Sequence, residues 1–163
     1  MPGNLTPGMR SVNDLLTEYG ESHQDPTNKR LHWVCVPPIV LAVLGLLWCV
    51  PVPAPLAMWS PWLNWASLGA AAAILYYLLL SPALALGALI GFAALLALTQ
   101  GFTHLPWPLW RTSLAIFVIA WVGQFIGHAV EGKRPSFFKD VQFLLIGPLW
   151  LEAALYRRFH VPY

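Results

Sequence analysis

The stretch TSLAIFVIAWVGQFIGHAVE, residues 112–131, decides the class of fold. Residues 112–130 contain no Asp, Glu, Lys or Arg, and a helix of roughly 17 to 25 apolar residues can cross the hydrocarbon core of a bilayer. Gln124, His128 and Glu131 follow a helical spacing of i, i+4 and i+7, so they share one face. Polar groups in a membrane helix are costly and usually functional. We therefore expect a transmembrane helix with a polar stripe at its C-terminal end.

Three more apolar stretches, residues 31–50, 65–81 and 83–100, are predicted to span the membrane. The whole chain is 58% hydrophobic and only 10% charged, whereas an average soluble domain is about one quarter charged. Such a chain of 163 residues must bury its apolar excess in lipid. We predict an all-α, polytopic membrane helical bundle of about four transmembrane helices, forming a single integral membrane domain over residues 1–163.

An amphipathic helix is expected to precede the first span, over residues 11–24, lying along the membrane surface. Ser11 with Asp14 three residues later resembles a capping box, which marks a helix start. Asp25 can cap the next helix with Pro26 at its first position. That second helix would carry its first polar side chains before it enters the membrane.

A C-terminal stretch, residues 141–156, is apolar but is interrupted by Gly147 and Pro148 and carries Glu152. The interruption and the carboxylate argue against a fifth span. We expect an interfacial or re-entrant helix there.

Basic residues are concentrated at one end of the predicted spans. Because cations favour the cytoplasmic side, both termini are predicted to be cytoplasmic in this multi-pass membrane protein. No basic stripe with interleaved aromatic residues points to nucleic acid. The cations that carry the topology argument are Lys29 and Arg30 before the first span and Lys133, Arg134 and Lys139 after the last, against Arg111 alone in the far loops.

The same topology gathers three of the five histidines, His23, His32 and His128, at one membrane edge. Imidazole is a common neutral metal ligand, and a site at that edge can receive the polar head of an amphiphile while its chain stays in lipid. We therefore predict a metal site with these three ligands. His104 falls in the far loop and His160 near the C-terminus, which makes both weaker candidates.

Glu131 has three possible roles in such a site. It could complete a carboxylate-and-histidine metal site, orient an imidazole by a hydrogen bond, or act as a base. Gln124 and Asn28 could instead be interhelical hydrogen-bonding residues. Two non-enzymatic alternatives also remain open, since the stripe suits a membrane proton or small-solute transporter, and the histidines could be incidental in a non-catalytic membrane scaffold.

Two distant motifs resemble the 2-hydroxy fatty acid dioxygenase family, and the similarity extends over roughly residues 13–156. Asp25 and Ser136 stand where the family pattern has Asn and Ala. The motif residues that carry the resemblance are His23, Asp25, Pro26, Asn28 and His32 near the start, and Gln124, Phe125, Gly127, His128, Glu131, Pro135, Gly147, Pro148 and Glu152 near the end.

The resemblance implies an iron(II)-dependent (Fe²⁺) membrane enzyme of fatty-acid α-oxidation, in which a 2-hydroxy fatty acid and O2 give a fatty acid one carbon shorter plus CO2. It implies that His23, His32 and His128 hold the iron, and a further family histidine could match His104. On this hypothesis the metal chelates the 2-hydroxyl and carboxylate of the substrate, the acyl chain lies between spans, and Glu131 is the base or a residue that orients a ligand.

Overall fold

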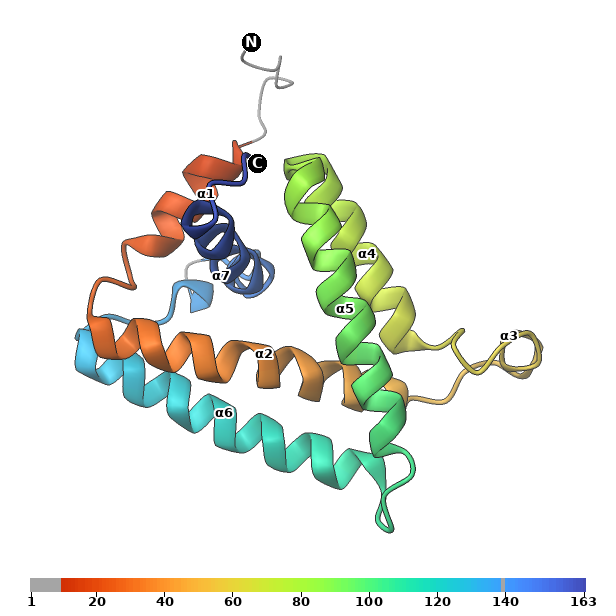
Figure 1. Cartoon of the computed structure of the whole chain (residues 1–163). Coiled ribbons are helices and arrows are strands. Elements are labelled where there is room, and N and C mark those ends of the chain that lie inside the picture. Colours follow the sequence, from red (N-terminus) through yellow and green to blue (C-terminus); the bar gives the residue numbers. More distant parts are fainter. Residues whose placement is uncertain (1–9, 139) are drawn as a thin grey trace.

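The computed structural model describes residues 10–138 and 140–163, and every regular element in them is helical. This confirms the predicted all-α class. In chain order the elements are α1 (Val12–Gly20), α2 (Pro26–Trp48), α3 (Ala54–Ala57), α4 (Trp65–Leu80), α5 (Pro82–Phe102), α6 (Leu109–Glu131), the short 3-10 helix η1 (Ser136–Phe138) and α7 (Phe143–Arg158) (Figure 1).

The first two helices begin at the capping residues that the sequence predicts. Ser11 and Asp14 form a capping box at α1, in which each side chain accepts a hydrogen bond from the backbone N–H of the other. Asp25 caps α2 by accepting two backbone N–H groups, and Pro26 is the first helical residue. Since α1 ends at Gly20, a short turn separates the two helices.

Helices α2 and α6 pack against each other along their lengths in antiparallel directions (Figure 1). A Cβ added to Gly123 would lie 2.6 Å from Cys35 Sγ, and one added to Gly127 would lie 2.5 Å from Asn28 Oδ1. The two glycines are four residues apart and therefore face α2 together. Small residues at this spacing let membrane helices approach closely, and here they bring the α2 backbone against α6.

Helices α4 and α5 form a second antiparallel pair, which is inclined to the first so that the two pairs make a V (Figure 1). Both long connections, residues 49–64 and 103–108, lie at the closed end of the V. In the part of the chain that the structure describes, three helices are long and apolar enough to cross a membrane, namely α2, α5 and α6. The other predicted span, α4, has 16 residues and is therefore only about 24 Å long.

Large apolar side chains cover the outer faces of these helices. Leu79 is 69% exposed, Ile90 66% and Ile119 72%. Exposed aliphatic side chains on successive long helices are what a lipid-facing surface requires.

Helix α7 lies between the arms of the V, and α1 packs against it across the open end (Figure 1). Leu15 from α1 and Ile146 and Leu149 from α7 are at most 1% exposed and belong to the main apolar core. Although Gly147 and Pro148 were expected to interrupt the C-terminal helix, α7 runs continuously through them over 16 residues. Pro148 removes a backbone hydrogen bond, but the surrounding helices hold α7 in place.

We predict that Gly123→Leu destabilises the protein, because the new side chain must displace Cys35 or separate α2 from α6. Overpacking of this kind costs about 1–3 kcal/mol. Thermal unfolding in detergent measures the effect as a lowered Tm. Gly101→Leu is the matched control, since a Cβ at Gly101 meets nothing within 4 Å; equal Tm values for the two variants would contradict close packing at Gly123.

Candidate metal centre

Three buried histidines converge between α1, α2 and α6. His23 lies in the turn between α1 and α2, His32 on the first part of α2, and His128 near the end of α6. They are 0%, 2% and 5% exposed, and their ring centroids are 4.1 to 5.1 Å apart. One ring nitrogen from each lies within 4.8 Å of the others. The convergence expected from the topology is therefore confirmed.

Backbone carbonyls determine the tautomers of two of these rings. His23 Nδ1 lies 2.6 Å from the carbonyl oxygen of Tyr19, and His32 Nδ1 lies 3.0 Å from that of Asn28. A carbonyl oxygen only accepts hydrogen bonds, so both Nδ1 atoms donate and both Nε2 atoms keep a lone pair. This is the arrangement that orients metal-bound histidines in other proteins.

The two Nε2 lone pairs face each other, because His23 Nε2 lies 2.8 Å from His32 Nε2. Two lone pairs at that distance repel unless they share a cation, which could be a proton or a metal ion. Burial lowers the pKa of His23 to about 4, so a shared proton is disfavoured at neutral pH. Two nitrogens about 2.1 Å from one metal at a right angle would be about 3 Å apart, so the pair fits a metal ion.

The third imidazole also offers a free nitrogen. His128 Nδ1 is buried and, within residues 10–138 and 140–163, has no hydrogen-bond partner. One ring nitrogen of His128 lies within 4.8 Å of the donor atoms of His23 and His32, so the cluster offers three nitrogen donors to one ion. The donor set, three neutral imidazoles, suits iron(II), zinc or copper rather than magnesium or calcium.

Glu131 holds the turn that carries His23. Its carboxylate accepts hydrogen bonds from the backbone N–H of Gln24 at 2.9 Å and of Asp25 at 2.7 Å, and from Asn28 Nδ2 at 3.2 Å. These bonds join the end of α6 to the start of α2. The nearest partners of the carboxylate are thus N–H donors of the backbone and of an amide, which favours a positioning role over that of a base.

Aromatic residues that sequence reasoning did not assign to the site enclose the histidines. The Tyr19 ring stacks on His23 with centroids 4.2 Å apart and planes 15° apart. Trp150 of α7 lies 5.5 Å from His23 on a centroid basis. Tyr19 precedes His23 by four residues, a spacing that could have signalled the contact, whereas nothing in the sequence pairs Trp150 with either.

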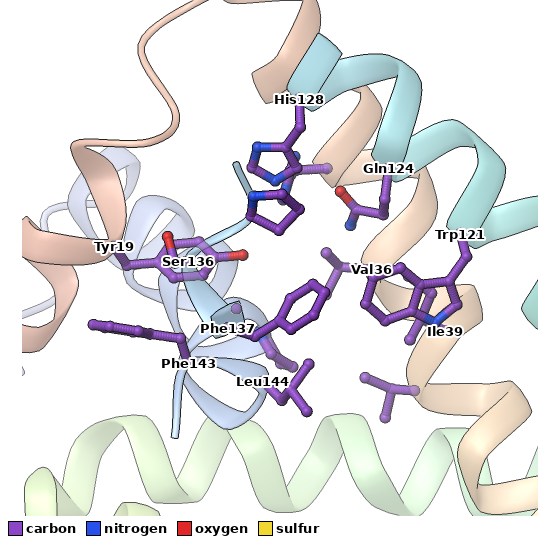
Figure 2. A pocket seen from close by; sticks show the side chains of 15 residues that line it. Tyr19, Val36, Ile39, Trp121, Gln124, His128, Ser136, Phe137, Phe143 and Leu144 are labelled. Carbon is purple, nitrogen blue, oxygen red and sulfur yellow. The ribbon is translucent and has the colours of Figure 1, made fainter. Parts of the chain in front are cut away.

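A cavity of about 60 Å³ adjoins the histidines (Figure 2). His32 and His128 line it, and Trp121 and Gln124 project toward it from the same side of α6 as His128, with Phe137 of η1 opposite. Its other lining residues are Tyr19, Val36, Ile39, Val40, Pro135, Ser136, Phe143, Leu144, Gly147 and Pro148.

Several polar atoms along this cavity have unused hydrogen-bonding capacity and could bind a ligand. Among the described residues, Gln124 Oε1, Trp121 Nε1 and Ser136 Oγ are buried without a hydrogen-bond partner. Buried polar groups are normally paired, so three such atoms beside one cavity suit a small polar group next to the histidines. Gln124 was predicted to belong to the stripe, whereas Ser136 was noticed only as a departure from the family pattern.

The other two histidines lie away from the cluster. His104 follows α5 in the connection to α6, at the closed end of the V (Figure 1). Since α6 has 23 residues, its two ends are about 35 Å apart, which separates His104 from His128. His160 lies beyond α7 in the exposed C-terminal segment. The structure thus brings together His23, His32 and His128 and leaves both weaker candidates outside.

These features define a polytopic helical membrane protein with a buried three-histidine cluster beside a small cavity. The chain belongs to the family described as 2-hydroxy-palmitic acid dioxygenase Mpo1-like, which matches residues 9–159. It is 28% identical over 146 residues to the 2-hydroxy-palmitic acid dioxygenase MPO1 of Saccharomyces cerevisiae. The aligned region covers 88% of this chain and 79% of the yeast protein. No solved structure matches the chain. The resemblance seen in the two motifs is therefore confirmed.

We predict that Glu131→Ala weakens metal binding about 10- to 100-fold, because the turn carrying His23 loses its acceptor. Titration of the purified protein with cobalt(II), followed by its visible absorption, measures the affinity. Glu21→Ala removes an equal charge from the same region, and its exposed carboxylate makes no hydrogen bond among the described residues. Equal affinities in the two variants would rule out the positioning role.

Proposed function

We propose that this protein is an iron(II)-dependent dioxygenase of fatty-acid α-oxidation, which converts a 2-hydroxy fatty acid and O2 into a fatty acid one carbon shorter and CO2. The observation that carries the proposal is the pair of Nε2 lone pairs of His23 and His32, which face each other at 2.8 Å beside a third free imidazole nitrogen. Membership of a family described as dioxygenases supports the reaction class.

His23 and His32 would hold the iron through Nε2, and His128 through the ring nitrogen that lies within 4.8 Å of the other donors. When bound, iron(II) would supply a Lewis acid for the hydroxyl and carboxylate of the substrate and the redox chemistry that dioxygen requires. Because three imidazole ligands are neutral, the protein ligands would not compensate the positive charge of the iron ion. That charge suits the carboxylate of a hydroxy acid, for which the described residues that line the cavity offer no Lys or Arg.

The proposed reaction balances with dioxygen alone. A 2-hydroxy acid RCH(OH)COOH and O2 give RCOOH, CO2 and H2O, with the C1–C2 bond broken and the former C2 becoming the new carboxyl carbon. The organic substrate loses as many electrons as the full reduction of dioxygen requires. The protein therefore needs no reductase partner for turnover.

The residues of the chain itself bind and enclose the reacting group. The Gln124 amide and the Ser136 hydroxyl offer hydrogen bonds to the polar head of the substrate. Trp121 and Phe137 line the cavity with aromatic surface, and the resulting apolar surroundings would strengthen electrostatic interactions there. Glu131, predicted from the sequence as the catalytic base or as a residue that orients a ligand, is proposed here to act by holding His23 in place.

We infer that the chain forms one membrane domain with both termini in the cytoplasm. The histidine cluster lies at the open end of the V, where α2 begins and α6 ends (Figure 1). Lys29 and Arg30 flank one of these helix ends, and Lys133 and Arg134 flank the other. The positive-inside rule then places the cluster on the cytoplasmic side, where a fatty acid can reach it from the adjacent leaflet.

Metal analysis and turnover of purified protein test the proposal. We expect stoichiometric iron after anaerobic loading with iron(II), and release of CO2 and a shortened fatty acid from 2-hydroxypalmitic acid in the presence of O2. His32→Ala should lose both the iron and the turnover, because it removes one of the two facing nitrogens. His104→Ala is the control and should retain both, since His104 lies at the far end of α6.

Two results would overturn this function. A loaded protein that is inert toward 2-hydroxy fatty acids would exclude the reaction, and unchanged iron content in His32→Ala would exclude the ligand set. A proton or solute flux in proteoliposomes that does not depend on His32 would instead support a transporter.

A further inference from the structure

A second, larger cavity of about 280 Å³ lies between α2, α5 and α7. Its lining is almost entirely apolar. Among the described residues that line it, Glu152 is the only acidic one, and none is basic. Figure 1 shows the arrangement of the helices that line it: α7 lies between the arm that contains α2 and the arm that contains α5. Its lining residues are Trp33, Val36, Pro37, Val40, Tyr77, Gly87, Ala88, Gly91, Phe92, Leu95, Pro148, Leu151, Glu152 and Leu155.

The two cavities are neighbours that share walls. Val36 and Val40 of α2 and Pro148 of α7 line both the cavity beside the histidines and the larger apolar one. These side chains are compact and separate the cavity beside the histidines, which has a few polar groups in its lining, from the larger apolar cavity. If the polar head of an amphiphile lies beside the histidines, its apolar tail can therefore reach the larger cavity by passing between these three residues.

We propose that the larger cavity holds the acyl chain of the 2-hydroxy fatty acid and that Gly91 sets the longest chain it accepts. This proposal rests on the function proposed above and adds the binding site for the tail of the substrate. The head occupies the small cavity, the chain crosses between Val36, Val40 and Pro148, and the tail lies along α5.

The charge of the lining determines which end of the substrate goes where. No Lys or Arg is among the described residues that line the larger cavity, and Glu152 contributes a carboxyl group there. A carboxylate head or a phospholipid headgroup would find no cation to pair with, and burying such a charge unpaired is costly. An alkyl chain meets no such penalty and gains from leaving water.

Gly91 is suited to limit chain length because it faces the cavity and leaves space there. Ala88, Gly91, Phe92 and Leu95 follow a helical spacing and form one side of the cavity. A Cβ added to Gly91 meets no atom within 4 Å, whereas one added to Gly87 would lie 2.0 Å from Glu152 Oε1. A larger side chain at Gly91 can therefore enter the cavity without displacing α7.

Substrate competition tests the role of Gly91. We expect Gly91→Leu to lower the kcat/KM for 2-hydroxypalmitic acid relative to 2-hydroxyoctanoic acid by about tenfold or more, with Gly91→Ala intermediate. Gly101→Leu is the matched control, because Gly101 is on the same helix, has open space around it, and lines neither cavity. A Gly91→Leu protein that folds and keeps the wild-type ratio would overturn the proposal.

Cross-linking of metal-free protein tests the location without relying on turnover. The probe is palmitic acid carrying a 2-hydroxyl group and a photoreactive diazirine near the end of its chain. We expect cross-links to α5 or α7 residues of the cavity, which an excess of 2-hydroxypalmitic acid removes and an excess of phosphatidylcholine does not. The yield should fall in Gly91→Leu and remain unchanged in Gly101→Leu.

The outcomes separate this proposal from the function on which it rests. Cross-links confined to lipid-facing residues such as Ile90, or removed equally by phosphatidylcholine, would exclude the cavity as the site of the tail even in an active enzyme. The protein could instead give cross-links within the cavity that excess 2-hydroxypalmitic acid removes, and yet turn over no hydroxy acid. That result would support the binding site and exclude the reaction.

Discussion

The close approach of α6 to α2 at Gly127 is the constraint on which the candidate site depends. The missing side chain at Gly127 leaves room for the side chain of Asn28. The backbone carbonyl oxygen of Asn28 accepts a hydrogen bond from His32 Nδ1, and its side-chain Nδ2 donates to the backbone carbonyl oxygen of Ser22 and to Glu131. One residue thus orients an imidazole, ties the preceding turn to α2, and connects α2 to the end of α6. A wider separation of the helices would change all three at once.

Hydropathy and helix chemistry were sufficient to predict the scaffold. Uncharged runs of the right length predicted the long helices, and caps such as Asp25 predicted where α2 begins. The four predicted spans implied an even number of crossings between His32 and His128, which predicted that the two histidines share one edge. These predictions succeed because they depend on local spacing and on the cost of charge in lipid.

The parts that could not be predicted arise from packing between distant segments. The sequence does not indicate that α7 lies in the V, because its place depends on the angle between two helix pairs. The position of α7 around Pro148 also depends on tertiary contacts, since Ile146 and Leu149 lie in the apolar core and Tyr77 of α4 donates to the carbonyl oxygen of Leu145 at 2.6 Å. The stacking of Tyr19 on His23 and the walls shared by the two cavities have the same origin. The sequence offered several roles for Glu131, and only its hydrogen-bond partners favour one of them.

The short length of α4 has a consequence for the membrane itself. Its 16 residues span about 24 Å, whereas the hydrocarbon core of a typical bilayer is about 30 Å thick. Lipid adapts to such a hydrophobic mismatch by thinning around the short helix, at a cost of fractions of a kcal/mol per Å. That cost is smaller in a thin bilayer, so a thin membrane would accommodate a spanning α4 with less deformation of the lipid than a thick one.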